Sequence, residues 1–168
     1  MLFHFKELAS KDVAAEFHER MNVDALVESR RDLLAASPLQ VDLTARYHGG
    51  VVRVEGQLTA EITMACSRCL KPVNETVLIP FEEQFALKPE ASEEDEDDDI
   101  IAVKEERVDL KPYVEQTFLL YLPFAPVCEE GCKGLCPVCG TDRNTASCGC
   151  DTEKVDPRLA GLKDFFKQ

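Results

Sequence analysis

The chain has 168 residues, 45% of them apolar, which is enough to bury one core of ordinary size. Its net charge of −13 has the wrong sign for a protein that coats nucleic acid, because binding to a phosphate backbone depends on Lys and Arg. No run approaches the ~20 apolar residues of a membrane span, and Lys6 and Glu7 interrupt the first apolar run before a signal-peptide core could form. We therefore expect a soluble, cytoplasmic protein with no membrane partner.

The first residues indicate short elements. Leu2 to Phe5 suggests a short strand, and residues 13–23 fit either a strand or a helix, of which we favour the strand. Asp24 has the short polar side chain that caps helices, so a short helix is predicted from there to about Ser29.

Residues 39–64 carry the clearest pattern in the chain. Apolar residues alternate with polar ones on both sides of Gly49-Gly50, which predicts an antiparallel hairpin with one buried face. A third strand follows from Val73 to Phe81, and Phe85 with Leu87 can extend it. The segment Cys66-Ser67-Arg68-Cys69 is then the turn between two strands.

A run of seven acidic residues, Glu93 to Asp99, separates this half from a different C-terminal third. Like charges repel one another, so we predict an acidic, disordered loop at 89–100. Beyond it, Asp109 can serve as the N-cap of a helix whose first turn contains Pro112, and Pro123 and Pro126 end this helix. Its expected apolar stripe consists of Val114, Phe118, Tyr121 and Leu122. Asp156-Pro157 predicts a last helix with Leu159, Leu162, Phe165 and Phe166 on its apolar side.

These elements predict an α+β fold. We expect an antiparallel, curved or barrel-like sheet with one packed helix, a cysteine-rich zinc-binding segment and a C-terminal helix. The expected divisions are a β-rich part at 1–88, the acidic loop at 89–100 and a third part at 101–168, packed on the first part as one unit.

Eight cysteines are the candidate functional residues. In a reducing compartment, closely paired cysteines indicate metal ligands rather than disulfides. Cys136-Pro137-Val138-Cys139-Gly140 has the form of a zinc knuckle, which Cys148 and Cys150 can complete. The other four would form a second structural site, so we expect one or two zinc ions. The complete set is Cys66, Cys69, Cys128, Cys132, Cys136, Cys139, Cys148 and Cys150.

Other roles for the cysteines stay open. An iron–sulfur cluster also takes four thiolates. A thioredoxin-like redox motif needs a strand-to-helix context, whereas Cys66 and Cys69 are predicted between strands. Cys128 and Cys132, with three residues between them, could be buried small apolar residues.

The sequence indicates no enzyme. Eight thiolates can close two zinc sites completely, while a catalytic zinc keeps an open position. The three histidines are scattered, and no nucleophile elbow or phosphate-binding glycine loop is present. We therefore expect no catalytic residue and no small-molecule substrate.

Several segments together resemble the YceD family, over about residues 38–166. They are Cys66-Ser67-Arg68-Cys69, the acidic stretch, Asp109-Leu110-Lys111-Pro112, the segment from Cys132 to Gly140 with its Gly-Leu-Cys-Pro core, and Val155 to Lys163. The resemblance implies a ribosome biogenesis factor that supports synthesis, processing or stability of large-subunit ribosomal RNA.

The partner is left open between two classes. The acidic balance favours a basic ribosomal protein, held through Glu93 to Asp99. Direct contact with large-subunit ribosomal RNA would instead use Arg68, Lys133 and Arg143, the basic residues beside the cysteines. A redox-sensitive zinc protein, or a general zinc-ribbon interaction module, is the alternative function.

Overall fold

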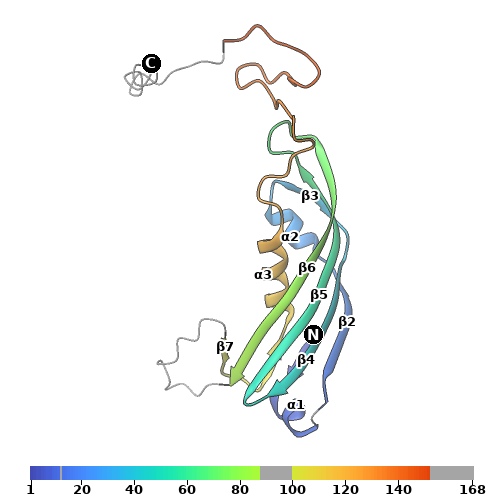
Figure 1. The fold of residues 1–168 in the computed structure, drawn as a ribbon, viewed down its shortest axis with the longest axis vertical. Helices are drawn as coiled ribbons and strands as arrows, with labels where there is room; N and C mark the ends of the chain where they lie inside the picture. Colours follow the sequence, from blue (N-terminus) through green and yellow to red (C-terminus); the bar gives the residue numbers. More distant parts are fainter. Residues whose placement is uncertain (12, 88–99, 152–168) are drawn as a thin grey trace, which may run out of the picture.

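A computed structural model describes residues 1–11, 13–87 and 100–151 of the chain, and these residues form an α+β fold (Figure 1). The strands are β1 (Leu2–His4), β2 (Ala15–Met21), β3 (Leu33–Ala36), β4 (Leu39–His48), β5 (Val51–Ala65), β6 (Pro72–Leu87), β7 (Ile100–Val103) and β8 (Arg107–Asp109). The helices are α1 (Phe5–Lys11), α2 (Asp24–Ser29) and α3 (Lys111–Tyr121).

One six-stranded sheet forms the body of the molecule. Its main order is β2-β4-β5-β6-β7, and β3 pairs with the far end of β5. All of these pairs are antiparallel except β6–β7, which is parallel. Among the described strands the sheet is open, with β2 and β7 at its ends, so the expected barrel-like closure is not found. A separate two-stranded ribbon joins β1 to β8.

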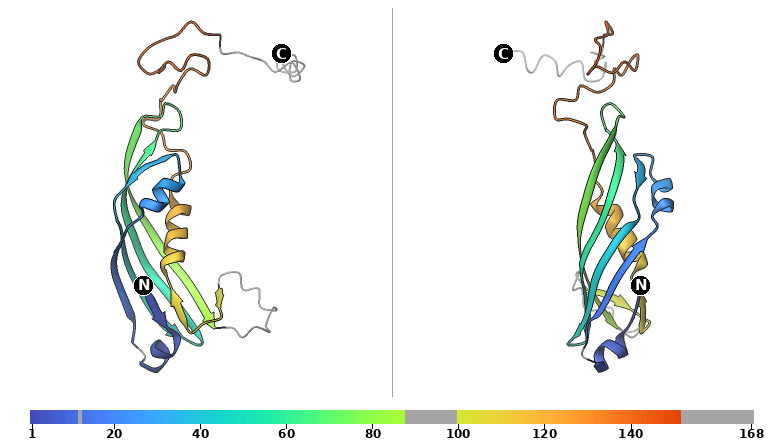
Figure 2. Two further views of the ribbon diagram at one scale, coloured as in Figure 1. Left: turned by 180° about the vertical axis from the view of Figure 1, so that it is seen from behind. Right: turned by 90° about the vertical axis from the view of Figure 1, so that its right-hand side faces the viewer.

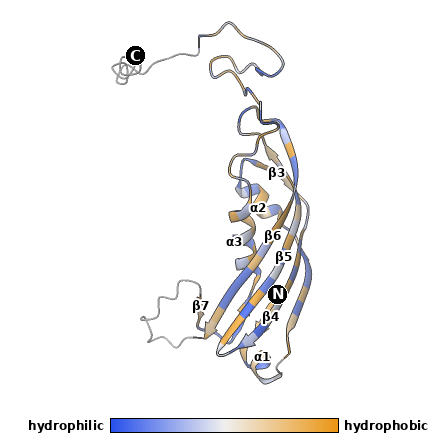
Figure 3. Cartoon of the chain, viewed as in Figure 1, coloured by the Kyte–Doolittle hydropathy of each residue, from blue (hydrophilic) through white to orange (hydrophobic). Residues whose placement is uncertain are grey.

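The predicted hairpin is confirmed as β4 and β5. Gly49 and Gly50 have φ values of 58° and 92°, the left-handed backbone that a two-residue hairpin turn requires. The register places Val41 opposite Leu58, and both are fully buried. Figure 3 shows the alternation of apolar and polar residues along the long strands. The predicted third strand is also confirmed, as β6, including its extension to Leu87.

Helix α3 closes the core on one face of the sheet (Figure 2). Val114 and Phe118 are both fully buried, and Leu122 follows just after the helix at 5% exposure. Tyr121 is 54% exposed, so its expected place in the buried stripe was wrong. At the other end of α3, Tyr113 packs edge-on against Phe85 with ring centroids 4.9 Å apart.

The helix starts differ from the prediction in one detail. Asp24 is the first residue of α2, not its cap, and its backbone N–H donates to the Asn22 side chain at 2.7 Å. Likewise Leu110 holds the cap position of α3, while Asp109 Oδ1 accepts a hydrogen bond from Lys111 N at 3.0 Å. In both helices the side chain that accepts the backbone N–H, Asn22 or Asp109, lies one residue before the cap position.

Some predictions fall outside the described residues. They are the acidic run from Glu93 to Asp99 and the last helix from Asp156. The division of the chain into three parts stays a prediction. No helix in residues 1–11, 13–87 and 100–151 has the length and apolar character needed to cross a membrane.

Candidate metal centre

The eight cysteines gather at one end of the sheet. Cys66 and Cys69 form the turn between β5 and β6, because Cys66 follows the last residue of β5 directly. Helix α3 runs toward the same end, and the chain leaves it for the segment 128–150, which carries the other six cysteines (Figure 1). Ser67 N donates to Pro126 O at 2.8 Å and joins the two segments.

The sulfurs form two separate groups of four. The first group is Cys66, Cys69, Cys128 and Cys132, here called the first tetrad. The second tetrad is Cys136, Cys139, Cys148 and Cys150. Within each tetrad all four Sγ atoms lie within 4.8 Å of one another. The fold thus brings the cysteines together in the two sets that their spacing suggested.

The spacing of the sulfurs suits one ion in each tetrad. Four ligands at the ~2.3 Å zinc–sulfur distance form a tetrahedron whose edges are about 3.8 Å long. In the first tetrad, Sγ of Cys66 lies 3.9 Å from Sγ of Cys132, and Sγ of Cys69 lies 3.5 Å from Sγ of Cys128. The donor set therefore fits a tetrahedral ion that prefers thiolates.

The two C-x2-C turns are built in the same way. In the first, Cys66 N donates to Lys71 O and Leu70 N donates to Cys66 O. In the second, Cys136 N donates to Thr141 O and Gly140 N donates to Cys136 O, with all four distances between 2.8 and 2.9 Å. The residue after the second cysteine has a left-handed backbone in both turns.

That residue differs between the two turns. Gly140 adopts a φ of 73° without strain, whereas Leu70 adopts 63° and is the one non-glycine residue with positive φ in the described chain. The Leu70 side chain is 64% exposed, so burial does not compensate for its backbone strain. The same turn is therefore formed twice, once against the local preference of its sequence.

The surroundings of Cys66 favour its thiolate. Burial opposes ionisation, but the backbone N–H groups of Cys69, Arg68 and Cys128 outweigh it and lower the Cys66 pKa to about 6. In the second tetrad, hydrogen bonds from Thr141 chiefly lower the Cys139 pKa to about 6.

Their neighbours respond in the opposite direction. Cys69 raises the pKa of Cys128 to about 12, and Cys139 does the same to Cys150. Four crowded sulfurs can all ionise only with a cation between them, as in a metal site.

The three basic residues predicted beside the cysteines have different places. The Arg68 side chain is held beside the first tetrad, because its Nη1 donates to Glu130 O at 3.2 Å and to Cys132 O at 2.9 Å. Lys133 and Arg143 are exposed. A fourth basic residue, Lys71, pairs with Asp142 at 2.8 Å and was not singled out in the sequence.

Sequence reasoning also missed Asn144. Its Nδ2 donates to Sγ of Cys132 at 3.5 Å, and its Oδ1 accepts from Lys133 N at 2.7 Å. Asp142 and Asn144, two residues apart in a loop, are typical of Asx turns, so a turn was foreseeable from local sequence. The contact with a cysteine twelve residues earlier in the chain was not.

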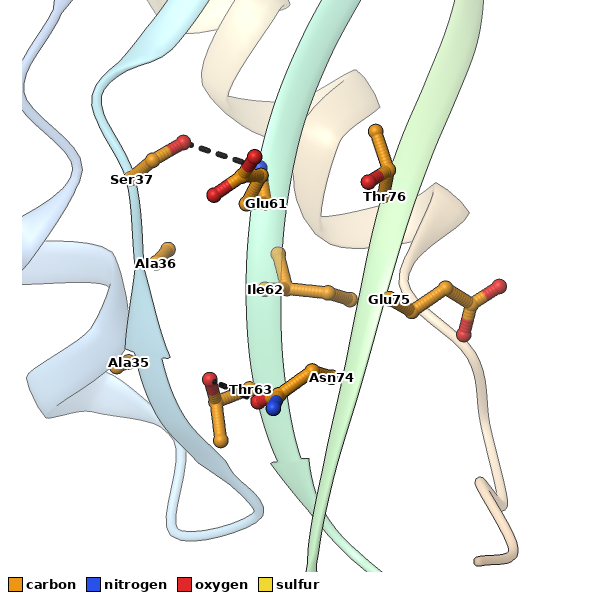
Figure 4. Close-up of a pocket in the computed structure, with 9 residues that line it drawn as sticks. All are labelled: Ala35, Ala36, Ser37, Glu61, Ile62, Thr63, Asn74, Glu75 and Thr76. Carbon is orange, nitrogen blue, oxygen red and sulfur yellow. Dashed lines mark hydrogen bonds between the residues drawn. The ribbon is translucent and has the colours of Figure 1, made fainter.

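Two other places in the described structure are weaker candidates for a functional site than the tetrads. A hollow of about 530 Å³ lies across β3, β5 and β6 (Figure 4). Its lining is Ala35, Ala36, Ser37, Glu61, Ile62, Thr63, Asn74, Glu75 and Thr76, without the aromatic walls usual in small-molecule sites. On β2, His18 Nδ1 lies 2.8 Å from Asp42 Oδ1 on β4, so this histidine has a partner that the sequence did not suggest.

Fold and site together define the class: an α+β protein whose open sheet carries, at one end, a module with two cysteine tetrads. Residues 54–166 match the family described as large ribosomal RNA subunit accumulation protein YceD. The chain belongs to the YceD family, as its motifs suggested. No solved structure matches it.

Relatives of the chain come from bacteria and plants. An uncharacterised protein of Mycobacterium tuberculosis is 37% identical over 76% of this chain and 62% of its own length. The uncharacterised protein YlbN of Bacillus subtilis is 31% identical over 91% of this chain and 88% of its own. The maize chloroplastic large ribosomal RNA subunit accumulation protein YCED homolog 1 is 27% identical over 77% and 53%. This chain thus spans about three fifths of the mycobacterial relative.

Proposed function

We propose that this chain is a zinc-stabilised, non-enzymatic factor of the cytoplasm that supports accumulation of large-subunit ribosomal RNA. The family match supports the biological role, since relatives such as the maize protein are named for it. The observation that carries the molecular part is the pair of complete cysteine tetrads. Four thiolates around one ion leave no open position for a substrate, which favours a structural metal.

Zinc fits the tetrads better than an iron–sulfur cluster. A four-iron cluster places metal and sulfide atoms between its cysteines, so their sulfurs lie farther apart than around a single ion. Sulfurs within 4.8 Å of one another favour one ion in each tetrad. Among single ions, zinc is the usual occupant of a four-cysteine structural site.

The metal would fold the segment that bears it. Residues 128–150 contribute few buried apolar side chains beyond the cysteines themselves, so burial alone gives this segment little stability. Bound zinc would hold it against the β5–β6 turn, at the end of the sheet. A rigid surface at this end is then available to a macromolecular partner.

A basic ribosomal protein is the partner that the charge favours. The chain carries −13, and each closed tetrad with a divalent ion would add two more negative charges. Arg68, one of the three residues proposed for RNA contact, already donates to two backbone carbonyls. Nuclease treatment before affinity purification separates the two partners. A basic protein retained after nuclease supports the proposal, and loss of all binding would favour RNA.

The function is tested by complementation of a strain that lacks the gene. The variant Cys148→Ser removes one ligand, and Ser147→Ala next to it is the matched control. We expect Cys148→Ser to lose zinc and to lower the ratio of large- to small-subunit ribosomal RNA, while the control keeps both. Normal RNA accumulation with Cys148→Ser would contradict the proposal. So would a purified wild-type protein that contains no bound zinc.

A redox-sensitive zinc protein is the second candidate. The observation in its favour is Cys139, which is exposed and has a pKa lowered to about 6 by Thr141. An exposed thiolate is the form that oxidants attack. Release of zinc under mild peroxide, followed by rebinding after reduction, would support this function. Retention of zinc under the same treatment would exclude it.

A further inference from the structure

We propose that the two tetrads bind metal as a coupled pair and that Asn144 is the positioning residue that couples them. This inference rests on the metal-binding function proposed above and adds how its two sites depend on each other.

Asn144 belongs to one tetrad by sequence and to the other by contact. It lies in the loop between Cys139 and Cys148, which both belong to the second tetrad. Its Nδ2 nevertheless donates to Sγ of Cys132, a member of the first tetrad, at 3.5 Å. Its Oδ1 accepts from the backbone N–H of Lys133 at 2.7 Å. One side chain therefore holds both the sulfur of Cys132 and the backbone next to it.

The position of Asn144 is itself fixed by its neighbours. Its backbone N–H and its Nδ2 donate to Oδ1 of Asp142 at 2.9 and 2.8 Å. The other carboxylate oxygen of Asp142 pairs with Lys71, two residues after Cys69. The Asx turn of the second tetrad's loop is thus fastened to the turn that carries the first tetrad.

Backbone hydrogen bonds reinforce this connection. Leu135 N donates to Arg68 O at 3.0 Å, and Arg143 N donates to Gly134 O at 2.9 Å. Leu135 also forms an isolated antiparallel bridge with Asp142. The short segment between Cys132 and Cys136 is therefore held on one side by the first C-x2-C turn and on the other by the loop with Asn144.

The physical consequence is linkage between the sites. A metal in the second tetrad would fix both ends of the loop 139–148 and hold Asn144 where it donates to Cys132. Residues that orient a metal ligand in this way typically change metal affinity by about 10- to 100-fold. Coupling between two binding equilibria is reciprocal, so each bound ion should raise the affinity for the other by the same factor.

The test uses Co²⁺ as the probe and measures its thiolate absorption in competition with a chelator. Cys148→Ser with Cys150→Ser isolates the first tetrad, and Cys66→Ser with Cys69→Ser isolates the second. The coupling factor is the affinity for two ions in the intact chain divided by the product of the two isolated affinities. We expect a factor of about 10 to 100 in the intact chain.

The variant Asn144→Ala keeps all eight cysteines and should lower the coupling factor toward one, because it removes the contact with Cys132. Arg143→Ala, an exposed neighbour, is the matched control and should leave it unchanged. Asn144→Asp keeps an acceptor oxygen for Lys133 N but loses the N–H donors to Cys132, so it should also lower the coupling factor. Far-UV circular dichroism checks that the sheet stays folded in each variant.

The outcomes distinguish this inference from the proposed function. Two bound Co²⁺ ions with a coupling factor near one, or a factor that Asn144→Ala does not change, would overturn the coupling while metal binding stands. Absence of cobalt–thiolate absorption in the intact chain would overturn both.

Discussion

Alanine variants of Gly134 and Gly140 can measure how much the contact with the β5–β6 turn stabilises the cysteine-rich segment 128–150, here called the module. Both have a left-handed backbone, with φ of 72° and 73°, so alanine should cost about 1 kcal/mol at either position. Their surroundings differ. A Cβ atom on Gly134 would lie 2.8 Å from Arg68 O, whereas a Cβ on Gly140 meets nothing within 4 Å.

The contact at Gly134 adds a second cost. Relief of the clash requires the backbone of residue 134 to move away from Arg68, which weakens the 3.0 Å hydrogen bond from Leu135 N to Arg68 O. With about 1 kcal/mol for that bond and some remaining steric strain, Gly134→Ala should destabilise the folded module by about 2–3 kcal/mol. Gly140→Ala should cost only about 1 kcal/mol.

Zinc affinity reports this difference, because folding of the module is coupled to metal binding. Competition with a chelator should show an affinity lowered about fivefold by Gly140→Ala and roughly 30- to 150-fold by Gly134→Ala. Gly140→Ala is thus the control for backbone conformation alone. Equal losses of affinity in the two variants would refute the argument that the module depends on its contact with Arg68.

Further predictions concern the core, one titrating pair and the module. Phe118→Ala should lower the free energy of unfolding, measured by urea denaturation, by about 3–5 kcal/mol. Leu120→Ala, on the exposed side of α3, is the control and should change it by less than about 0.5 kcal/mol. Similar effects of the two variants would contradict the packing of α3. The hydrogen bond to Asp42 raises the pKa of His18 above 6.5, so an NMR titration should show a lower value in Asp42→Asn. Because the His18 pKa is higher in the folded than in the unfolded protein, the pairing stabilises the fold at pH values below the unfolded pKa. This stabilisation is lost as the pH rises through the folded pKa. An unchanged His18 titration in Asp42→Asn would exclude this pairing. Cys139→Ser should make residues 133–150 sensitive to limited proteolysis while the sheet stays resistant, and a module as resistant as the wild type would argue against metal-dependent folding.

The strands and the cysteine pairs were predictable because their signals are local. Alternation on both sides of Gly49-Gly50 specifies a hairpin, since a strand places successive side chains on opposite faces. The C-x2-C spacing likewise specifies a turn with two sulfurs on one side. Helix α3 was found for the same reason, apart from the orientation of Tyr121, which depends on what lies beside its last turn.

Only some of the short elements were found in this way. The strand predicted at Leu2 to Phe5 is β1 and the helix predicted from Asp24 is α2, but β7 and β8 were not predicted. Strand β8 pairs with β1 more than a hundred residues earlier, and its three residues are too few to show a period of their own. Strand β7 pairs in parallel with β6, and no pattern in the neighbouring sequence predicts this pairing. The open form of the sheet is also a property of the whole set of pairings and not of any one strand.

The sequence by itself therefore determined the hairpin, the main helix and the eight candidate ligands. Only the tertiary structure decided how the second tetrad's loop lies on the first, through Asn144 to Cys132 and Asp142 to Lys71. The reason is physical: spacing along the chain constrains residues within one turn, whereas hydrogen bonds between turns depend on where the sheet and α3 place the two segments.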